Sequence, residues 1–239
     1  MRKYIFVFLW VSILSYTTGF AQTETHTKKN NLEFSTGYNS GSLLNLELAP
    51  VARYNYSGLA YKLIYERTSK KQNIFEVELN FLGKTTLKTN RLSNFNTEIL
   101  KAGIDFLYLK QVYNKNSLSI HVGLQSRSNV SAFYNESDYF DLHQEFGIAS
   151  RFKYQLNEKQ YLSSRITIPF VLVRLTDVNV NLHSFNNYQS VLWNLKYGYK
   201  LSERFDINAT YDFNYNRLQV PSAYRELQHQ INIGINYKF

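Results

Sequence analysis

The chain contains no cysteine. This absence excludes a disulfide scaffold, thiolate metal sites, a cysteine nucleophile and the lipid-modified cysteine of a bacterial lipoprotein. Proline occurs only 3 times and methionine once. Beyond residue 21 there is no apolar run near the ~20 residues that a membrane-spanning helix needs. The mature protein is therefore expected to be either soluble or a membrane barrel.

Aromatic residues are abundant instead, with 20 Tyr and 17 Phe in 239 residues. Tyr and Phe are typical of β-strands, so the composition favours an all-β protein. The mean hydropathy of −0.36 argues against helical membrane spans. It does not argue against a barrel, because a barrel strand exposes only alternate residues to lipid.

The first residues have the layout of a secretory signal peptide. Arg2 and Lys3 give a basic start, Ile5 to Leu14 is apolar, and Gly19, Phe20 and Ala21 place small residues before Gln22. The apolar run is about half of the ~20 residues of a spanning helix, which favours a cleaved peptide over a retained anchor. We expect residues 1–21 to be removed on export and residues 22–239 to form a single domain.

Strand-like alternation is clearest in the last nine residues, INIGINYKF. One face of an extended strand there carries the apolar residues Ile231, Ile233, Ile235, Tyr237 and Phe239, and the other carries Asn, Gly and Lys. This period of two residues predicts a strand with one apolar and one polar face. Similar alternation occurs in residues 75–81, 100–108, 118–124, 146–154 and 205–215.

Short polar turns punctuate these segments at Lys71, Lys115, Glu158 and Glu203, which are 44, 43 and 45 residues apart. This spacing corresponds to one hairpin of a membrane barrel with a short turn at one end and a longer loop at the other. It predicts ten strands at residues 31–38, 55–68, 73–84, 97–112, 117–127, 141–156, 160–174, 188–201, 204–216 and 228–239. The longer connections then fall at residues 39–54, 85–96, 128–140, 175–187 and 217–227.

Two segments leave the strand assignment open. Residues 43–54 alternate well enough to extend the second strand or to add a hairpin, so twelve strands are an alternative, as are eight. Residues 166–175 are apolar almost throughout and contain Pro169 and Arg174, so their facing is ambiguous.

Tyrosines lie near the ends of many predicted strands, where a ring can sit in lipid with its hydroxyl in water. We expect an interfacial girdle formed by Tyr54, Tyr56, Tyr61, Tyr65, Tyr108, Tyr113, Tyr154, Tyr161, Tyr197, Tyr199, Tyr211, Tyr215 and Tyr237. The alternate faces carry Gly, Asn and charges of both signs. These features favour a transmembrane antiparallel up-and-down barrel over a soluble secreted β domain.

The C-terminal segment NIGINYKF resembles the β-signal of bacterial outer-membrane proteins, with Asn232, Gly234, Tyr237 and the terminal Phe239 at the positions of that pattern. The resemblance implies a Gram-negative cell envelope, location in the outer membrane and insertion by the barrel assembly machinery through strand addition. The Tyr- and Asn-rich style looks like outer-membrane proteins of Bacteroidota-type bacteria. No functional family is implied. We expect the last strand to close against the first, near Leu32 to Tyr38.

If the apolar faces meet lipid, the charged residues of the other faces line the lumen. A ten-stranded barrel is only slightly wider than one whose interior side chains fill it, so these charges should pair. The predicted network is either a structural filling or the wall of a narrow polar pore or small-ligand site. It comprises Lys62, Glu66, Glu76, Glu78, Lys101, Asp105, His121, Glu145, Arg151, Lys153, Arg165, Lys196, Lys200, Asp206 and Asp212. His143 and Lys238 are further basic candidates for the same faces.

Catalytic candidates are few. His143 and Glu145 are two residues apart and share a face, whereas His183 and Ser184 are neighbours that point to opposite faces of a strand. The spacing of outer-membrane phospholipases and lipid A deacylases is therefore not matched. The sequence also suggests none of the Asp–Asp or Asp–His pairs of ten-stranded outer-membrane proteases. No metal site or cofactor is expected.

The predicted function is non-enzymatic: a porin-like small-solute channel, or a structural or partner-binding element of the cell surface. The alternative is a barrel hydrolase that acts on lipid or peptide. Lys84, Lys88 and Arg91 in a predicted outer loop could meet lipopolysaccharide, and an envelope protein partner is left open. Nucleic acid is not an expected partner, because the basic residues are spread over the strands instead of forming a patch.

Overall fold

The computed structural model describes residues 29–47, 53–89, 97–134, 139–177, 179–220 and 223–239. The expected signal peptide, residues 1–21, lies outside these ranges. In the described residues no helix is long and apolar enough to cross a membrane.

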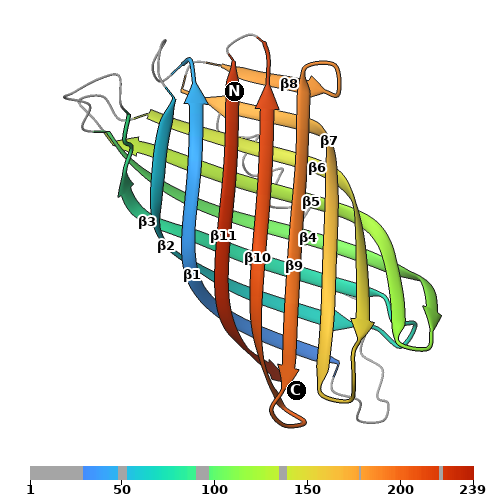
Figure 1. The fold of residues 1–239 in the computed structure, drawn as a ribbon. Helices are drawn as coiled ribbons and strands as arrows, with labels where there is room; N and C mark the ends of the chain where they lie inside the picture. The colour runs from blue at the N-terminus through green and yellow to red at the C-terminus, as the bar shows by residue number, and fades with distance from the viewer. Residues whose placement is uncertain (1–28, 48–52, 90–96, 135–138, 178, 221–222) are drawn as a thin grey trace.

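The described chain consists of antiparallel strands joined by turns (Figure 1). The strands are β1 (Asn30–Asn45), β2 (Tyr54–Thr68), β3 (Ile74–Thr86), β4 (Glu98–Lys115), β5 (Leu118–Tyr134), β6 (Tyr139–Gln155), β7 (Gln160–Thr176), β8 (Val180–Ser184), β9 (Tyr188–Lys200), β10 (Phe205–Leu218) and β11 (Tyr224–Lys238). Ten of them close into a barrel, as the hairpin spacing predicted, and β8 is a short addition paired only with β7.

The barrel closes between its first and last strands. Leu32 pairs with Tyr237 and Tyr38 with Ile231, which confirms the predicted closure. At the periplasmic end of this pairing, Asn30 of β1 and Phe239, which follows β11, exchange two backbone hydrogen bonds of 3.1 and 2.9 Å. Closure removes the exposed strand edges on which β-proteins aggregate.

The two ends of the barrel differ. All four predicted short turns are present, connecting β2 to β3, β4 to β5, β6 to β7 and β9 to β10 at the end where Figure 1 places the C-terminus. In the first two turns, Gln72 and Asn116 adopt positive φ angles of 59° and 53°. In barrels of this type the short turns face the periplasm and the longer loops face outward. We use "periplasmic" and "outer" for these two ends.

Apolar side chains point outward over most of the barrel height. Phe34, Ile231, Ile233 and Ile235 are 55%, 63%, 71% and 57% exposed, whereas Asn232 between them is only 1% exposed. A protein that folds in water places these residues the other way round. The outward belt therefore suits contact with lipid.

The alternation reverses near the outer end of the strands. In β2, Leu59 and Leu63 are exposed on the outside, yet Tyr56 is 2% exposed and faces inward between the exposed Asn55 and Ser57. No residue is inserted in β2 between these positions. The apolar face has therefore moved from the outside of the barrel to the inside.

The same reversal occurs on neighbouring strands. Leu218 and Tyr224 are buried inside, whereas the adjacent Arg217 and Arg225 lie on the outward face, where Arg217 meets Gln189. Strands of 13 to 18 residues are longer than the ~9–11 residues needed to span a membrane. We infer that the outer part of the barrel rises above the lipid, where polar residues face water and apolar ones form a core.

The reversal explains why two tyrosines of the expected girdle, Tyr54 and Tyr56, face inward. Tyr161 lies at the periplasmic end, on the lumenal face of β7 that it shares with Ser163 and Arg165. Of the predicted girdle, Tyr108, Tyr154 and Tyr197 are 53%, 49% and 40% exposed, and they point outward. Tyr54, Tyr56 and Tyr161 were predicted to point outward too, but the structure buries all three rings in the lumen, with exposures of 0%, 2% and 7%. The girdle prediction was wrong for these residues.

A bulge in β7 resolves the facing of residues 166–175. Gly147 pairs with Pro169 but Phe146 pairs with Val171, so Phe170 is an extra residue. The inward positions shift from Thr167 and Pro169 to Leu172 and Arg174. Beyond Thr167, β7 leaves β9 and pairs with β8 instead.

Two predicted boundaries were wrong. Residues 39–45 continue the first strand instead of forming a connection or an extra hairpin, and residues 180–184 form β8 inside the connection predicted at 175–187. Most other strands also extend farther into the predicted outer loops, because the barrel continues above the membrane belt.

Candidate functional site

The outer part of the lumen is filled by a core of buried apolar and aromatic side chains, here called the outer plug. These side chains come from nine of the barrel strands and from Leu87, which directly follows β3, and are at most 4% exposed. The outer plug consists of Leu43, Tyr54, Tyr56, Ala60, Leu82, Leu87, Ile99, Phe133, Leu172, Tyr188, Leu218 and Tyr224. Because interiors of this kind are close-packed, the outer plug leaves little room for a solute to pass.

An ion pair lies beside the outer plug. The Arg174 side chain is 2% exposed and donates to Asp141 through Nε at 3.0 Å and Nη2 at 2.8 Å. Its Nη2 also donates to Asn45 Oδ1 at 3.3 Å, and its guanidinium lies 5.3 Å from the centre of the Tyr224 ring. A bidentate contact of this kind is among the strongest polar interactions that a protein makes.

A network of charges crosses the middle of the lumen. Lys62 Nζ lies 3.0 Å from Glu78 and 2.9 Å from Asp212, and all three side chains are at most 8% exposed. Asp212 also accepts from Asn194 at 2.7 Å and from Asn232 at 3.1 Å. The lysine on β2 thus connects the neighbouring strand β3 with β10, on the far side of the closure between β1 and β11.

Two arginines extend this network toward the periplasmic end. Arg165 contacts Glu76 and lies 3.1 Å from Glu78, while Arg151 contacts Glu76 and lies 2.7 Å from Glu66. Each of the two arginines therefore contacts two carboxylates, and Glu76 is shared between them. An unpaired charge in such a position would cost several kcal/mol, so the pairing stabilises the barrel.

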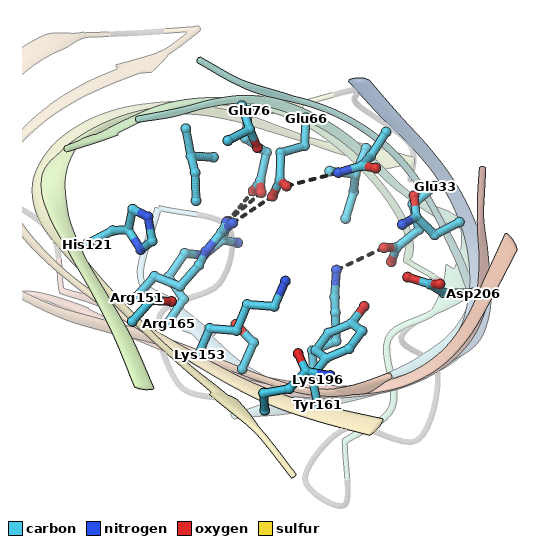
Figure 2. Close-up of a pocket in the computed structure, with 18 of the residues that line it drawn as sticks. Glu33, Glu66, Glu76, His121, Arg151, Lys153, Tyr161, Arg165, Lys196 and Asp206 are labelled. Carbon is cyan, nitrogen blue, oxygen red and sulfur yellow. Dashed lines mark hydrogen bonds and ion pairs between the residues drawn. The ribbon is translucent and has the colours of Figure 1, made fainter. Parts of the chain in front are cut away.

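Below the network, the periplasmic half of the lumen contains a polar cavity of about 470 Å³, here called the periplasmic cavity. Figure 2 shows Arg151, Arg165, Lys153 and Lys196 reaching into it from one side, with Glu66 and Glu76 opposite. Its wall also includes turn residues such as Gln72 and Asn116, which places its mouth at the periplasmic end. A cavity between the network and the outer plug is much smaller, about 40 Å³.

The structure places all fifteen residues of the predicted charge network on lumenal strand faces. Several of them make pairs not yet described: Lys101 contacts Glu226, Lys196 lies 2.8 Å from Glu33, and Asp105 accepts from Gln125 at 3.0 Å. His121 Nε2 lies 3.1 Å from the Gln72 carbonyl oxygen.

Sequence reasoning missed five charged residues of the lumen: Glu33, Arg127, Asp141, Arg174 and Glu226. Alternation gave a signal for Glu33, which shares a face with Ser35, and for Arg127, which shares one with His121 and Gln125. Glu226 had none, because the last strand was expected to begin at residue 228.

The catalytic candidates do not assemble into a reactive group. His143 Nε2 lies 3.0 Å from Asp141 Oδ1, an Asp–His pair that the sequence did not suggest, but both side chains are at most 8% exposed. Glu145 is buried beside Tyr188 and Arg127. In the described residues, no serine or threonine hydroxyl hydrogen-bonds either His143 or His183.

His183 and Ser184 face opposite sides of β8, as expected for neighbours in a strand. His183 is 7% exposed and Ser184 is on the exposed face. In the described ranges, no cluster of three or more His, Asp or Glu side chains is arranged to hold a metal ion.

Two of the three residues proposed to meet lipopolysaccharide, Lys84 and Lys88, lie at the outer end. Lys84 pairs with Glu98 and also lies 5.1 Å from the centre of the Tyr134 ring, while the Lys88 backbone bridges to Asn55. Arg91 lies outside the described residues. Lipopolysaccharide contact stays a prediction.

The residues of the β-signal pattern lie in the strand that closes the barrel. Asn232 is buried in the lumen, Tyr237 and Phe239 stack outside with ring centres 5.7 Å apart, and Gly234 faces Ser35 of β1. A Cβ on Gly234 would come within 2.8 Å of the Ser35 side chain, so the close approach of β1 favours glycine there. Recognition by the assembly machinery stays a prediction.

Comparison with known proteins gives the fold and no functional family. No protein-family model matches the chain, and no curated protein matches it. The outer-membrane protease OmpT from Escherichia coli aligns over 91% of this chain and 99% of its own, with a TM-score of 0.63 and 10% identity.

Two other similar structures are the translocator domain of the autotransporter NalP from Neisseria meningitidis and the Neisserial surface protein NspA. NalP aligns over 98% of this chain and 95% of its own, with a TM-score of 0.49 and 8% identity. NspA aligns over 90% of this chain and 100% of its own, with a TM-score of 0.42 and 10% identity. Together with the closed strand order and the outward apolar belt, the OmpT alignment shows that this chain has the fold of an outer-membrane β-barrel protein.

Proposed function

We propose that this protein is a non-enzymatic outer-membrane barrel that is closed to solutes at its outer end and open to the periplasm as a small-solute binding cavity. The observation that carries the proposal is the asymmetry of the lumen. A polar cavity of about 470 Å³ occupies the periplasmic half, whereas the outer half holds the close-packed outer plug. This asymmetry supports the small-ligand site expected in the lumen over a porin-like channel.

All residues of the outer plug except Leu87, which directly follows β3, lie in barrel strands, so the plug depends little on the outer loops. Tyr56 and Tyr224 both donate to Glu226, which Lys101 also contacts. Tyr56 on β2 and Tyr224 on β11 lie on the two strands that flank β1, and Lys101 reaches the same carboxylate from β4. Opening a path would require breaking a buried hydrogen-bonded group, which is unfavourable.

Conductance across a planar lipid bilayer tests the closure. The wild-type protein should give no stable unitary steps, and the double variant Y56A/Y224A should give them, because two rings of the outer plug are removed. The matched control is Y38A/Y108A, which removes two outward-facing rings, 56% and 53% exposed, and should stay silent. Heat-modifiable migration on a gel checks that each variant is folded.

Stable steps from the wild-type protein, equal to those of Y56A/Y224A, would reject the closed lumen and favour the channel.

A hydrolase centred on the Asp141–His143 pair is the competing function. That pair is buried beside Arg174 and the Tyr224 ring, and the described residues give it no nucleophile. We therefore expect no hydrolysis of phospholipid or casein above that of the H143A variant. A wild-type rate that H143A abolishes would favour the enzyme.

A further inference from the structure

We propose that the periplasmic cavity binds a small oxyanion, a solute with carboxylate or phosphate groups, on Lys153 and Lys200. This inference rests on the proposed function, since it names the chemistry of the ligand for the same cavity. The observation behind it is the pattern of ion pairs in the described wall of the cavity, which leaves two lysines without a carboxylate partner.

The carboxylates of the periplasmic cavity all have cationic partners. Glu33 lies 2.8 Å from Lys196, and Asp206 lies 2.7 Å from Lys238. The remaining carboxylates, Glu66, Glu76 and Glu78, contact Arg151, Arg165 or Lys62. The acidic groups of the wall are therefore already neutralised.

Two lysines of the described wall make no ion pair. Seven Lys and Arg residues line the cavity against five Asp and Glu residues, an excess of two. Among the described residues, Lys153 and Lys200 make no ion pair, whereas the other five basic residues each make at least one. The excess corresponds to these two side chains.

The surroundings of both lysines explain why they remain unpaired. Lys200 pairs across the strands with Asp206, but both oxygens of that carboxylate lie 2.7 Å from Lys238. Lys153 Nζ lies 4.7 Å from the centre of the buried Tyr161 ring and points into the open part of the cavity (Figure 2). Nothing in the described wall offers either ammonium group a free carboxylate.

Like charges add to this excess. Glu66, which already pairs with Arg151, attracts the charge of Lys153, but the three cations Arg151, Lys238 and Lys200 also lie close enough to repel it. Inside a narrow wall of low dielectric, such repulsion is screened less than at an open surface. An anion with several oxygens relieves the repulsion and accepts from the ammonium groups, which makes it the ligand class that fits.

The size of the cavity agrees with a small solute. Its volume of about 470 Å³ falls within the range of roughly 300–1,000 Å³ that small-molecule sites occupy. Wall side chains such as Ser163 and Asn194 add uncharged polar groups beside the lysines.

Isothermal titration of the full-length protein in detergent at low ionic strength tests the inference, with inorganic phosphate and citrate as separate probes. The test variant is K153Q/K200Q. The matched control is K110Q/K115Q, which removes the same charge from exposed positions near the same end of the barrel that do not line the cavity.

The wild-type protein should bind at least one probe saturably, and added NaCl should weaken binding. Each charge-assisted contact contributes about a tenfold change in affinity, so K153Q/K200Q should bind about 100-fold more weakly. K110Q/K115Q should remain within about twofold of wild type, because distant exposed charges are screened. Binding of phosphate alone or citrate alone supports the inference and identifies the anion source.

No saturable binding of either probe by the wild-type protein, or an equal loss in both double variants, overturns the inference. A silent bilayer with no anion binding would reject the anion and leave the closed barrel standing. Anion binding together with wild-type conductance would reject the closure and retain the anion site.

Discussion

Replacing Arg174 by methionine tests the buried charge pairs most sharply. The Arg174 and Asp141 side chains are both 2% exposed, and Met keeps most of the arginine volume while removing its charge. Asp141 would retain only His143 at 3.0 Å and Asn45 at 3.3 Å. Removing one partner of a buried ion pair costs about 3–5 kcal/mol, so R174M should lower the free energy of unfolding by that amount.

The double variant R174M/D141L distinguishes two costs of the R174M substitution: the unpaired buried charge of Asp141 and the loss of side-chain packing. Replacing both partners of a buried pair by apolar residues is often neutral, so the double variant should recover most of the loss. R67M is the control, since Arg67 is exposed and surface substitutions usually stay within about 0.5 kcal/mol.

Urea unfolding in phospholipid vesicles measures these differences, followed by the fluorescence of Trp193. This residue is the one tryptophan of the expected mature chain and lies on the barrel wall, where it donates to Ser164 at 3.0 Å. The reasoning fails if R174M unfolds within about 1 kcal/mol of wild type, or if R174M/D141L is less stable than R174M.

Three further predictions concern the belt, the lumen wall and the last residue. I233K places a charge in the middle of the outward belt, at a residue 71% exposed, and should lower the free energy of unfolding in vesicles by about 2–4 kcal/mol. N55K, above the belt, should change it little, and equal effects of the two variants would contradict the lipid assignment. G198V should destabilise the barrel by about 1–3 kcal/mol in the same assay, because a Cβ there would lie 2.1 Å from the Tyr161 ring, and an unchanged urea midpoint would show that the ring moves freely. F239A should reduce the amount of heat-modifiable protein in outer-membrane fractions without altering the stability of refolded protein by more than about 1 kcal/mol; normal amounts would argue against Phe239 as an assembly signal.

Much of the barrel could be predicted from the sequence because lipid on one side and polar groups on the other impose a strict period of two. Ile231, Ile233 and Ile235 alternate with Asn232 and Gly234, and they do face outward as expected. The four polar turns fixed the hairpin spacing, and hence the ten barrel strands.

The misplacement of Tyr54 and Tyr56 has a physical cause. Apolar residues occupy the outward positions at Leu59 and Leu63 but the inward positions at Tyr54 and Tyr56, with no inserted residue between them. Alternation identifies a face and does not tell whether lipid or a protein core covers it. A change of phase inside a strand is therefore a signal that the strand leaves the membrane.

The partners in the lumen could not be predicted. Lys196 meets Glu33, 163 residues away, and Lys62 meets Asp212, 150 residues away, only because β11 closes against β1. The facing of Arg174 depends on the extra residue Phe170 in β7, which no local pattern marks. The sequence assigned the charged residues to the lumen. It could not show that two of them, Lys153 and Lys200, would have no ion-pair partner among the described residues.

Sided labelling of single cysteine variants tests the central claim, a lumen open to the periplasm and closed to the outside. The chain has no native cysteine, so each variant contains a single thiol. The three positions are S163C in the periplasmic cavity, S190C at the level of the outer plug and S40C on the outer surface. With a charged, membrane-impermeant thiol reagent, S163C should react only from the periplasmic side, S40C only from the outer side, and S190C from neither. Rapid labelling of S163C from the outer side would contradict the closed lumen.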